Sequence, residues 1–314
     1  MSGDPSLRLL SIDLLGDDEH DNLDVWGNRA VLTRPAPAAA SIPELFSAQV
    51  NRTPTATALT CAERSWSYLE LDRTANRLAH VLVDHGARPG AVVALLFTRS
   101  AEAIIAILAV LKSGAAYLPI DPAHPDARIA FMVTDAAPVV AVATADLRAR
   151  LTNCDIPVIV GDGLAYDGSP DDRLPEPAAD DLAYLTYTSG TTGVPKAVAV
   201  THLNVTQLLQ SLPVELPSGG QQVWSQWHSL VFDVSVWEIW GACCTVAAWW
   251  WCRSRWEAHR WTCMTCCSHR RSRYCAKLLP RQECCHQTAW IRRHWWWQAK
   301  PARRIWSDAG RRGG

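Results

Sequence analysis

Cysteine is scarce in the first 242 residues, and the whole chain of 314 residues lacks a long apolar run. Only Cys61 and Cys154 precede residue 242, which excludes a disulfide framework as the basis of this part of the fold. No apolar run approaches the roughly 20 residues that a membrane-spanning helix needs. The N-terminus, Met1–Pro5, has neither a basic start nor an apolar stretch, so we expect no signal peptide. These absences predict a cytoplasmic protein.

Acidic residues are scarce after residue 242. Residues 1–242 hold 15 Lys and Arg against 28 Asp and Glu, whereas residues 243–314 hold 15 against 3. Nine of the 11 cysteines and ten of the 16 tryptophans also fall in the second segment. A change this abrupt indicates a boundary of some kind. The formal net charge of -1 for the whole chain therefore conceals two unlike segments.

Strand and helix patterns alternate over residues 41–242. The preceding residues, 1–40, are acidic and then rich in proline and alanine, which predicts a linker. Capping-box patterns at Ser41–Glu44 and Ser67–Glu70 predict the first residues of two helices. Apolar runs predict buried strands at residues 92–97, 139–143 and 157–160, with helices between them. The alternation predicts an α/β fold with a mainly parallel sheet.

A loop rich in glycine and hydroxyl residues lies between two apolar runs. Leu185–Lys196 has the sequence LTYTSGTTGVPK, and strands are expected before it and at Ala197–Thr201 after it. Glycines allow backbone N–H groups to turn toward an anion, hydroxyls add donors, and lysine adds a positive charge. The pattern is not the Walker loop, G-x-x-x-x-G-K-[ST]. It predicts a phosphate-binding loop, with a flexible surface turn as the alternative.

An aspartate opens the last apolar helix before the boundary. Phe232–Trp240 predicts a helix with Phe232, Val236, Ile239 and Trp240 on one face. Within such an apolar helix the carboxylate of Asp233 is costly unless it is paired. The alternative is an exposed aspartate that interacts with the helix dipole.

Four motifs, in order and spacing, resemble those of the adenylation domains of nonribosomal peptide synthetases, within the adenylate-forming (AMP-binding) enzymes. They are Ser67–Leu71, Leu111–Asp121, Leu185–Lys196 with Thr201-His202, and Phe232–Glu238. Residues 1–40 also look like the linker that follows a condensation domain. The resemblance implies that residues 41–242 form part of the large N-terminal subdomain of this fold, truncated, with parallel-rich sheets and packed helices.

The resemblance implies a reaction in which an amino acid carboxylate joins the α-phosphate of ATP and pyrophosphate leaves. The aminoacyl group then passes to the phosphopantetheine thiol of a carrier protein. ATP and Mg²⁺ are the implied cofactors. The implied partners are an amino acid, a peptidyl carrier protein and condensation domains, with no nucleic acid and no membrane.

The same resemblance implies roles for individual residues. Asp233 would accept the α-ammonium of the amino acid, while Val234 and Trp237 would line the pocket for its side chain. For this pocket we expect serine or another small polar amino acid. The residues that would bind the ATP phosphates are Thr188, Ser189, Gly190, Thr191, Thr192, Gly193 and Lys196.

Several parts of the family pattern are missing from the readable frame. They are the adenine and ribose motifs, the acidic residue linked to magnesium, the hinge, and the small C-terminal subdomain with its catalytic lysine. We therefore assign no catalytic residue and expect the chain as written not to complete the half-reaction. We also expect poor solubility, because an incomplete sheet exposes strand edges. An acyl-CoA or aryl-acid ligase of the same superfamily is the alternative, and Asp233 argues against it because such acids have no ammonium.

Residues 243–314 do not have the pattern of a packed domain. Their tryptophan runs, Trp249–Trp251 and Trp295–Trp297, belong to no helical or strand period. Metal-ligand residues occur at short spacing, but no second clean pair follows at a finger-like interval. A zinc or nucleic-acid-binding tail on a non-catalytic remnant is the alternative to an unfolded tail. The ligand residues in question are Cys263, Cys266, Cys267, His269, Cys284, Cys285 and His286.

A shift of reading frame accounts for the composition of this tail. Cysteine and tryptophan have few codons, so the underlying bases are nearly fixed. With one base restored, codons compatible with Cys243–Cys252 give LLHGGGLVVVP in the adjacent frame. This apolar run resembles the family sequence directly after the fourth motif. We therefore expect that one base is missing near codon 242 and that residues 243–314 are out of frame and unfolded.

Overall fold

The computed structural model describes residues 15–27, 38–161, 166–188, 195–211, 222–243, 247–251 and 300–301. The chain divides into two units, Met1–Ala38 and Ala39–Gly314. The first contains helix α1 (Asp17–Trp26), which has three acidic residues in its first turn and buries none of its side chains. This helix lies within the stretch for which only a linker is predicted.

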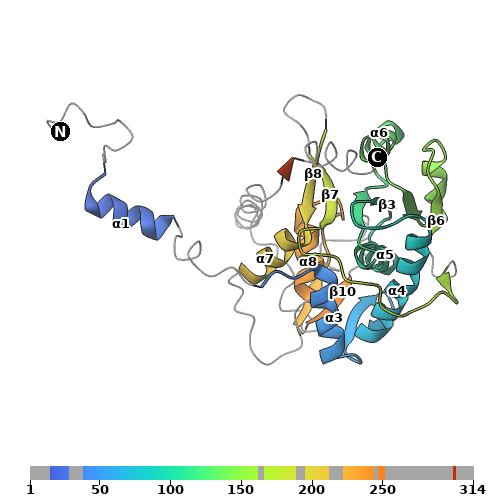
Figure 1. Ribbon diagram of the computed structural model, residues 1–314, viewed down its shortest axis with the longest axis horizontal. Helices are drawn as coiled ribbons and strands as arrows, with labels where there is room; N and C mark the ends of the chain where they lie inside the picture. Colours follow the sequence, from blue (N-terminus) through green and yellow to red (C-terminus); the bar gives the residue numbers. More distant parts are fainter. Residues whose placement is uncertain are drawn as a thin grey trace, which may run out of the picture. The chain divides into compact units, whose positions relative to one another are not determined.

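The second unit contains the α/β fold that the alternating pattern predicts (Figure 1). Its helices are α3 (Ile42–Arg52), α4 (Tyr68–Asp84), α5 (Ala101–Lys112), α6 (Asp126–Ala136), the 3₁₀ helix η2 (Arg148–Leu151), α7 (His202–Ser211) and α8 (Asp233–Cys243). Its strands are β1 (Thr57–Cys61), β2 (Arg64–Ser67), β3 (Val92–Leu96), β4 (Ala116–Ile120), β5 (Val140–Ala143), β6 (Val158–Val160), β7 (Leu182–Thr188), β8 (Lys196–Thr201), β9 (Gln222–Ser225), β10 (Ala247–Trp251) and β11 (Lys300–Pro301).

The strands form two sheets. The larger sheet has the order β11-β8-β7-β4-β3-β5-β6, and the smaller has the order β2-β1-β10-β9. In the larger sheet β7, β4, β3, β5 and β6 are mutually parallel, whereas β8 pairs antiparallel with β7. The carboxyl ends of β3, β4 and β7 therefore lie along one edge of the sheet, where open parallel sheets bind ligands.

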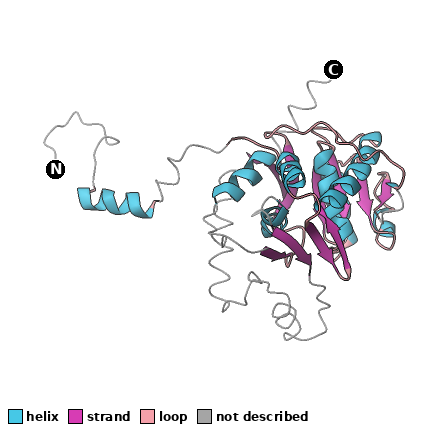
Figure 2. Cartoon of the chain, turned by 90° about the horizontal axis from the view of Figure 1, so that it is seen from below, coloured by secondary structure: helices cyan, strands magenta, loops and turns pink. Residues whose placement is uncertain are grey.

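Helices cover both faces of the larger sheet, as Figure 2 shows from a second direction. Alternate residues of β3 explain this arrangement, because successive side chains of a strand point to opposite faces. Val93 and Leu95 belong to the core that contains α4 and α5, while Val92, Ala94 and Leu96 belong to the core that contains α6. Burial on both faces accounts for the continuous apolar runs at these strands.

The predicted capping boxes begin helices in the structure. The Ser41 hydroxyl accepts the Glu44 N–H at 3.2 Å, and the Glu44 carboxylate accepts the Ser41 N–H at 3.3 Å. Ser67 and Glu70 make the same reciprocal pair at 3.2 and 2.7 Å. Because each pair satisfies two N–H groups that a helix leaves without intrahelical partners, the local sequence fixes where α3 and α4 begin.

Three features differ from the sequence predictions. Phe232 lies before α8 and is 48% exposed, so it is not part of the buried helix face; Val236, Ile239 and Trp240 are buried as expected. The strands β2 and β9 are not predicted from their sequences. Finally, β10 lies within the stretch expected to be unfolded, and it pairs in parallel with both β1 and β9.

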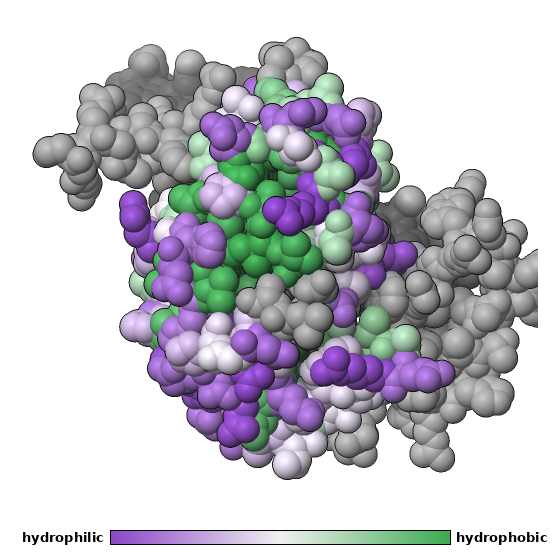
Figure 3. All heavy atoms as spheres, turned by 90° about the vertical axis from the view of Figure 1, so that its right-hand side faces the viewer, coloured by the Kyte–Doolittle hydropathy of each residue, from purple (hydrophilic) through white to green (hydrophobic). Residues whose placement is uncertain are grey.

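Apolar side chains also gather on the surface, on the side of the molecule that carries β6 (Figure 3). Val158 and Val160 of this strand are only partly buried, and β6 is the last strand on its side of the larger sheet. An open apolar strand edge promotes association between chains. Among the described helices, none is both long and apolar enough to cross a membrane.

Candidate functional site

The expected phosphate loop joins two strands of the larger sheet. Strands β7 and β8 form an antiparallel hairpin in which Thr188 lies opposite Lys196, and the Thr188 hydroxyl donates to the Lys196 carbonyl at 3.5 Å. Lys196 is exposed and Thr188 is half-buried, so both can reach a ligand in solvent. The other predicted phosphate-binding residues lie outside the described part of the chain; they are Ser189, Gly190, Thr191, Thr192 and Gly193.

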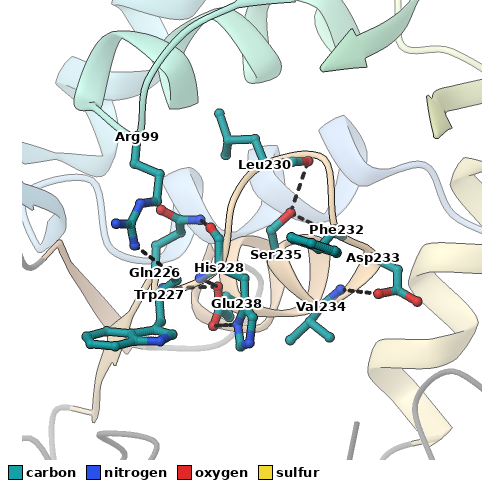
Figure 4. Close-up of polar contacts among 10 residues, drawn as sticks. All are labelled: Arg99, Gln226, Trp227, His228, Leu230, Phe232, Asp233, Val234, Ser235 and Glu238. Carbon is teal, nitrogen blue, oxygen red and sulfur yellow. Dashed lines mark hydrogen bonds and ion pairs between the residues drawn. The ribbon is translucent and has the colours of Figure 1, made fainter. Parts of the chain in front are cut away.

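Asp233 is the first residue of α8, with its side chain at the helix N-terminus (Figure 4). Its Oδ1 accepts the N–H of Val234 at 2.9 Å. A carboxylate at this end of a helix is stabilised by the helix dipole. Val234 is buried, and the half-buried Trp237 packs against Trp224 with 4.7 Å between ring centroids. The three residues expected to bind the amino acid thus lie on the first two turns of one helix.

The segment from Gln226 to Phe232 connects β9 to α8 and crosses the carboxyl edge of the larger sheet. The Thr186 hydroxyl, on β7, donates to the Val231 carbonyl at 3.1 Å. The Ser229 hydroxyl donates to Oδ2 of Asp121, directly after β4, at 2.6 Å. These contacts place the start of α8 beside the strand that leads into the phosphate loop. The sequence predicts both motifs but not their contact.

Glu238 is a member of this site that sequence reasoning missed. Its side chain is buried, and its Oε2 accepts the backbone N–H groups of Trp227 and His228 at 3.1 Å each (Figure 4). Its Oε1 lies 2.7 Å from Nδ1 of His228. The hydrogen bond with Glu238 raises the pKa of His228, and burial opposes this shift. The signal available in the sequence was a glutamate on the buried side of an apolar helix.

His202 has a structural contact. It is fully buried as the first residue of α7, and its Nδ1 accepts the backbone N–H of Ile42 at 3.4 Å. Burial lowers the pKa of His202 to about 4, so the ring is neutral near pH 7. The hydrogen bond from the Ile42 N–H to this neutral ring connects the start of α7 to the first turn of α3.

No metal centre emerges from the part of the chain that the structure describes: it contains no cluster of three His, Cys, Asp or Glu side chains arranged to hold an ion. The cysteines and histidines of the tail considered as zinc ligands lie outside the described residues.

These observations define the class: an α/β protein with a candidate ligand site at the carboxyl edge of its parallel sheet. An acidic helix N-terminus lies there beside a hairpin that carries a hydroxyl and a lysine. Comparison with known proteins then identifies the family. The model of the AMP-binding enzyme family matches residues 46–269. The chain belongs to this family and contains part of an adenylation domain of the nonribosomal peptide synthetase type.

Individual relatives agree with this assignment. The chain is 58% identical over 240 residues to the isonitrile lipopeptide synthase of Mycobacterium tuberculosis, covering 76% of this chain and 9% of that protein. It is 38% identical over 250 residues to a dimodular nonribosomal peptide synthase of Bacillus subtilis, covering 76% of this chain and 10% of that protein. Among solved structures, the nonribosomal peptide synthetase FmoA3 in its AMPPNP-bound form superposes with a TM-score of 0.66 at 30% identity, covering 74% of this chain and 25% of that one.

Proposed function

We propose that this chain is the amino-acid- and ATP-binding part of an enzyme that activates an amino acid as its aminoacyl-adenylate for nonribosomal peptide synthesis. In this reaction a carboxylate oxygen forms a bond to the α-phosphorus of ATP, and the bond from that phosphorus to pyrophosphate breaks. The observation that carries the proposal is the 3.1 Å hydrogen bond from Thr186 to Val231, which joins the strand before the phosphate loop to the segment before Asp233.

On the phosphate side, the Lys196 ammonium, the Thr188 hydroxyl and the loop from Ser189 to Gly193 would hold the phosphates of ATP. Charge and hydrogen-bond donors fixed beside a departing pyrophosphate stabilise the charge that develops on it. Thr188 and Lys196 lie opposite each other on one hairpin, so they would act on the phosphates together.

On the amino acid side, Asp233 would pair with the α-ammonium, and Val234 and Trp237 would line the side-chain pocket. Only one carboxylate oxygen of Asp233 accepts a hydrogen bond in the described structure, which leaves the other oxygen for a ligand. An aryl or fatty acid offers no cation to this oxygen, and the arrangement therefore favours an amino acid. A small polar amino acid such as serine is the substrate we propose.

The remaining participants are proposed from the family. Mg²⁺ would accompany ATP, but the described residues contain no cluster fitted to hold it, so we assign it no ligands and no step. The acceptor of the aminoacyl group would be the phosphopantetheine thiol of a peptidyl carrier protein, and condensation domains would be neighbouring partners.

ATP binding tests the phosphate side. Calorimetric titration of the 314-residue chain with ATP should give a Kd about tenfold weaker for Lys196→Ala than for the unmodified chain, the size expected when one charge-assisted contact is removed. Arg148→Ala is the matched control, because Arg148 is an exposed cation on η2. Equal affinities of the two variants for ATP would show that Lys196 does not bind the phosphates.

Amino acid binding tests the other side. The chain is titrated with each of the twenty proteinogenic amino acids and, for any that binds, with the corresponding acid lacking the amino group. Asp233→Asn should weaken the amino acid and leave the deaminated acid unchanged, while the exposed control Asp146→Asn should change neither. Binding of the deaminated acid as strongly as the amino acid would contradict the pairing with Asp233.

A further inference from the structure

The segment Gln226–Phe232 is held by side chains from four separate parts of the chain. Besides Thr186 and Asp121, the Arg99 guanidinium, which follows β3, donates to the Trp227 carbonyl. Glu238, from within α8, accepts the backbone N–H groups of Trp227 and His228 and also contacts the His228 ring. The carbonyl of Trp227 and the N–H groups of Trp227 and His228 are thus bound by side chains from separate parts of the chain (Figure 4).

Glu238 makes the most extensive of these contacts. Its two carboxylate oxygens meet three donors, all within 3.1 Å, and the residue is only 5% exposed. A buried carboxylate is tolerated when hydrogen bonds of this kind satisfy both of its oxygens. Removing it would leave two backbone N–H groups in a partly buried loop without acceptors, which is unfavourable.

The contacts of Glu238 have a direct consequence for Asp233. Glu238 lies five residues after Asp233 on the same helix, and its side chain binds the backbone of Trp227 and His228, six and five residues before Asp233. The Ser235 hydroxyl fixes the intervening turn, because it donates to the Phe232 carbonyl at 2.6 Å. The backbone of Asp233 is therefore held on both sides: by α8 after it, and before it by a loop that Glu238 attaches to α8.

We propose that Glu238 is a positioning residue for substrate: through Trp227 and His228 it fixes the strand-to-helix segment so that Asp233 meets the α-ammonium of the amino acid. This inference rests on the proposed function. Glu238 touches neither the substrate nor ATP in this scheme and acts only through the loop. His228 shares the role because its ring completes the contacts of the carboxylate.

A double-mutant cycle on the 314-residue chain distinguishes positioning from general destabilisation. The ligand is the amino acid that binds the unmodified chain most tightly among the twenty. Glu238→Gln should weaken that binding about tenfold, yet by less than about twofold when Asp233 is already Asn, because contacts that act through one another are not additive. ATP affinity should not change. The exposed Glu63→Gln is the matched control and should leave both affinities unchanged.

Amide hydrogen exchange of the peptide containing Trp227 and His228 provides a readout that needs no ligand. Exchange there should be faster in Glu238→Gln than in Glu63→Gln. If Glu238→Gln does not fold, His228→Phe, which removes only the ring contact, should show the same ligand-selective loss to a smaller extent. If no amino acid binds the unmodified chain, the proposed function fails. If an amino acid binds but Glu238→Gln leaves amide exchange of this peptide unchanged, the positioning role is overturned. It is also overturned if Glu238→Gln weakens amino acid binding equally whether residue 233 is Asp or Asn.

Discussion

The buried ion pair between Lys112 and Asp72 illustrates how strongly one pair of residues can affect the stability of the fold. Lys112 Nζ lies 2.7 Å from Oδ1 of Asp72, and both side chains are 5% exposed. Burial lowers the pKa of Lys112, while the adjacent Asp72 carboxylate opposes that shift. The pair connects α4 to the end of α5, and Arg173 approaches the same carboxylate at 3.6 Å.

Asp72→Asn should therefore destabilise the protein strongly. The substitution leaves the Lys112 ammonium buried without its counter-charge, and breaking a buried pair in this way costs about 3–5 kcal/mol. Urea unfolding monitored by circular dichroism measures the free energy of unfolding. The control is Asp126→Asn, which removes a pair with Arg150 that is 76% exposed on the Asp126 side and should cost about 1 kcal/mol or less. Equal losses in the two variants would show that burial does not govern the effect.

His202 should make the protein sensitive to acid. Its pKa is about 4 in the folded chain against 6.5 for an ordinary histidine, so between these values the unfolded chain binds a proton that the folded chain does not. The free energy of unfolding should be fully retained above pH 6.5 and should decrease as the pH falls toward 4, by an amount on the order of 3 kcal/mol. Urea unfolding at several pH values measures this decrease. The variant His202→Gln should have a shallower dependence, and an unchanged slope would contradict the role of burial.

At the residue scale, local motifs point to single residues, whereas contacts between residues far apart in the chain escape prediction. Asp233, Lys196 and Thr188 are recognisable because their motifs are contiguous in the chain. Lys112 and Asp72 are 40 residues apart, and Glu238 and His228 are 10 apart with a change of chain direction between them. Such contacts depend on how helices and loops pack, which local patterns do not encode.

At the scale of elements, Gly114 shows how one position fixes the path from α5 to β4. Its φ is +81°, and a Cβ at this position would lie 2.9 Å from Cδ of Pro89. Gly90 has nearly the same φ, +83°, but nothing lies within 4 Å of a Cβ there. The two glycines share the conformational requirement and differ in the space around them.

Substitution by alanine separates these two effects. Gly90→Ala should lose about 1–2 kcal/mol because of the left-handed backbone alone. Gly114→Ala should lose more, since the new methyl group also overlaps the Pro89 ring and the neighbouring backbone must shift. Thermal and urea unfolding of both variants give the comparison. A loss at Gly90 equal to or larger than that at Gly114 would mean that the close contact is relieved without cost.

Elements were predictable where their signals are local. The capping serines Ser41 and Ser67 predicted where α3 and α4 begin, and apolar runs predicted the strands β3 and β5. The strands β2 and β9 escaped prediction because each has only four residues and each pairs with one neighbouring strand in the smaller sheet. Pairing with β1 and β10 creates them, and the sequence of β2 or β9 alone does not specify that pairing.

For the whole molecule, the smaller sheet depends on residues beyond the change in composition. Strand β10 lies between β1 and β9, so its backbone joins two strands of the first segment. The paired positions include Trp249 and Trp250, opposite Leu59 and Thr60. Tryptophan has the single codon TGG, and a run of this codon read one base earlier gives GTG, which encodes valine. Both residues favour strands, so either reading frame supplies a strand at this place.

The reading frame itself is the last property open to test. We expect the nucleotide sequence to lack one base near codon 242, so that restoring it extends the family similarity through residues 243–314. The reason is physical as well as genetic: the present tail places basic, aromatic and thiol side chains without any period that could bury them, whereas the adjacent frame gives apolar runs that can form strands. DNA sequencing across codons 235–250 is the measurement. An intact gene whose adjacent frame encodes no family sequence would contradict the expectation, and so would one zinc ion per chain in the purified protein, because a bound metal would give the tail an ordered role in its own frame.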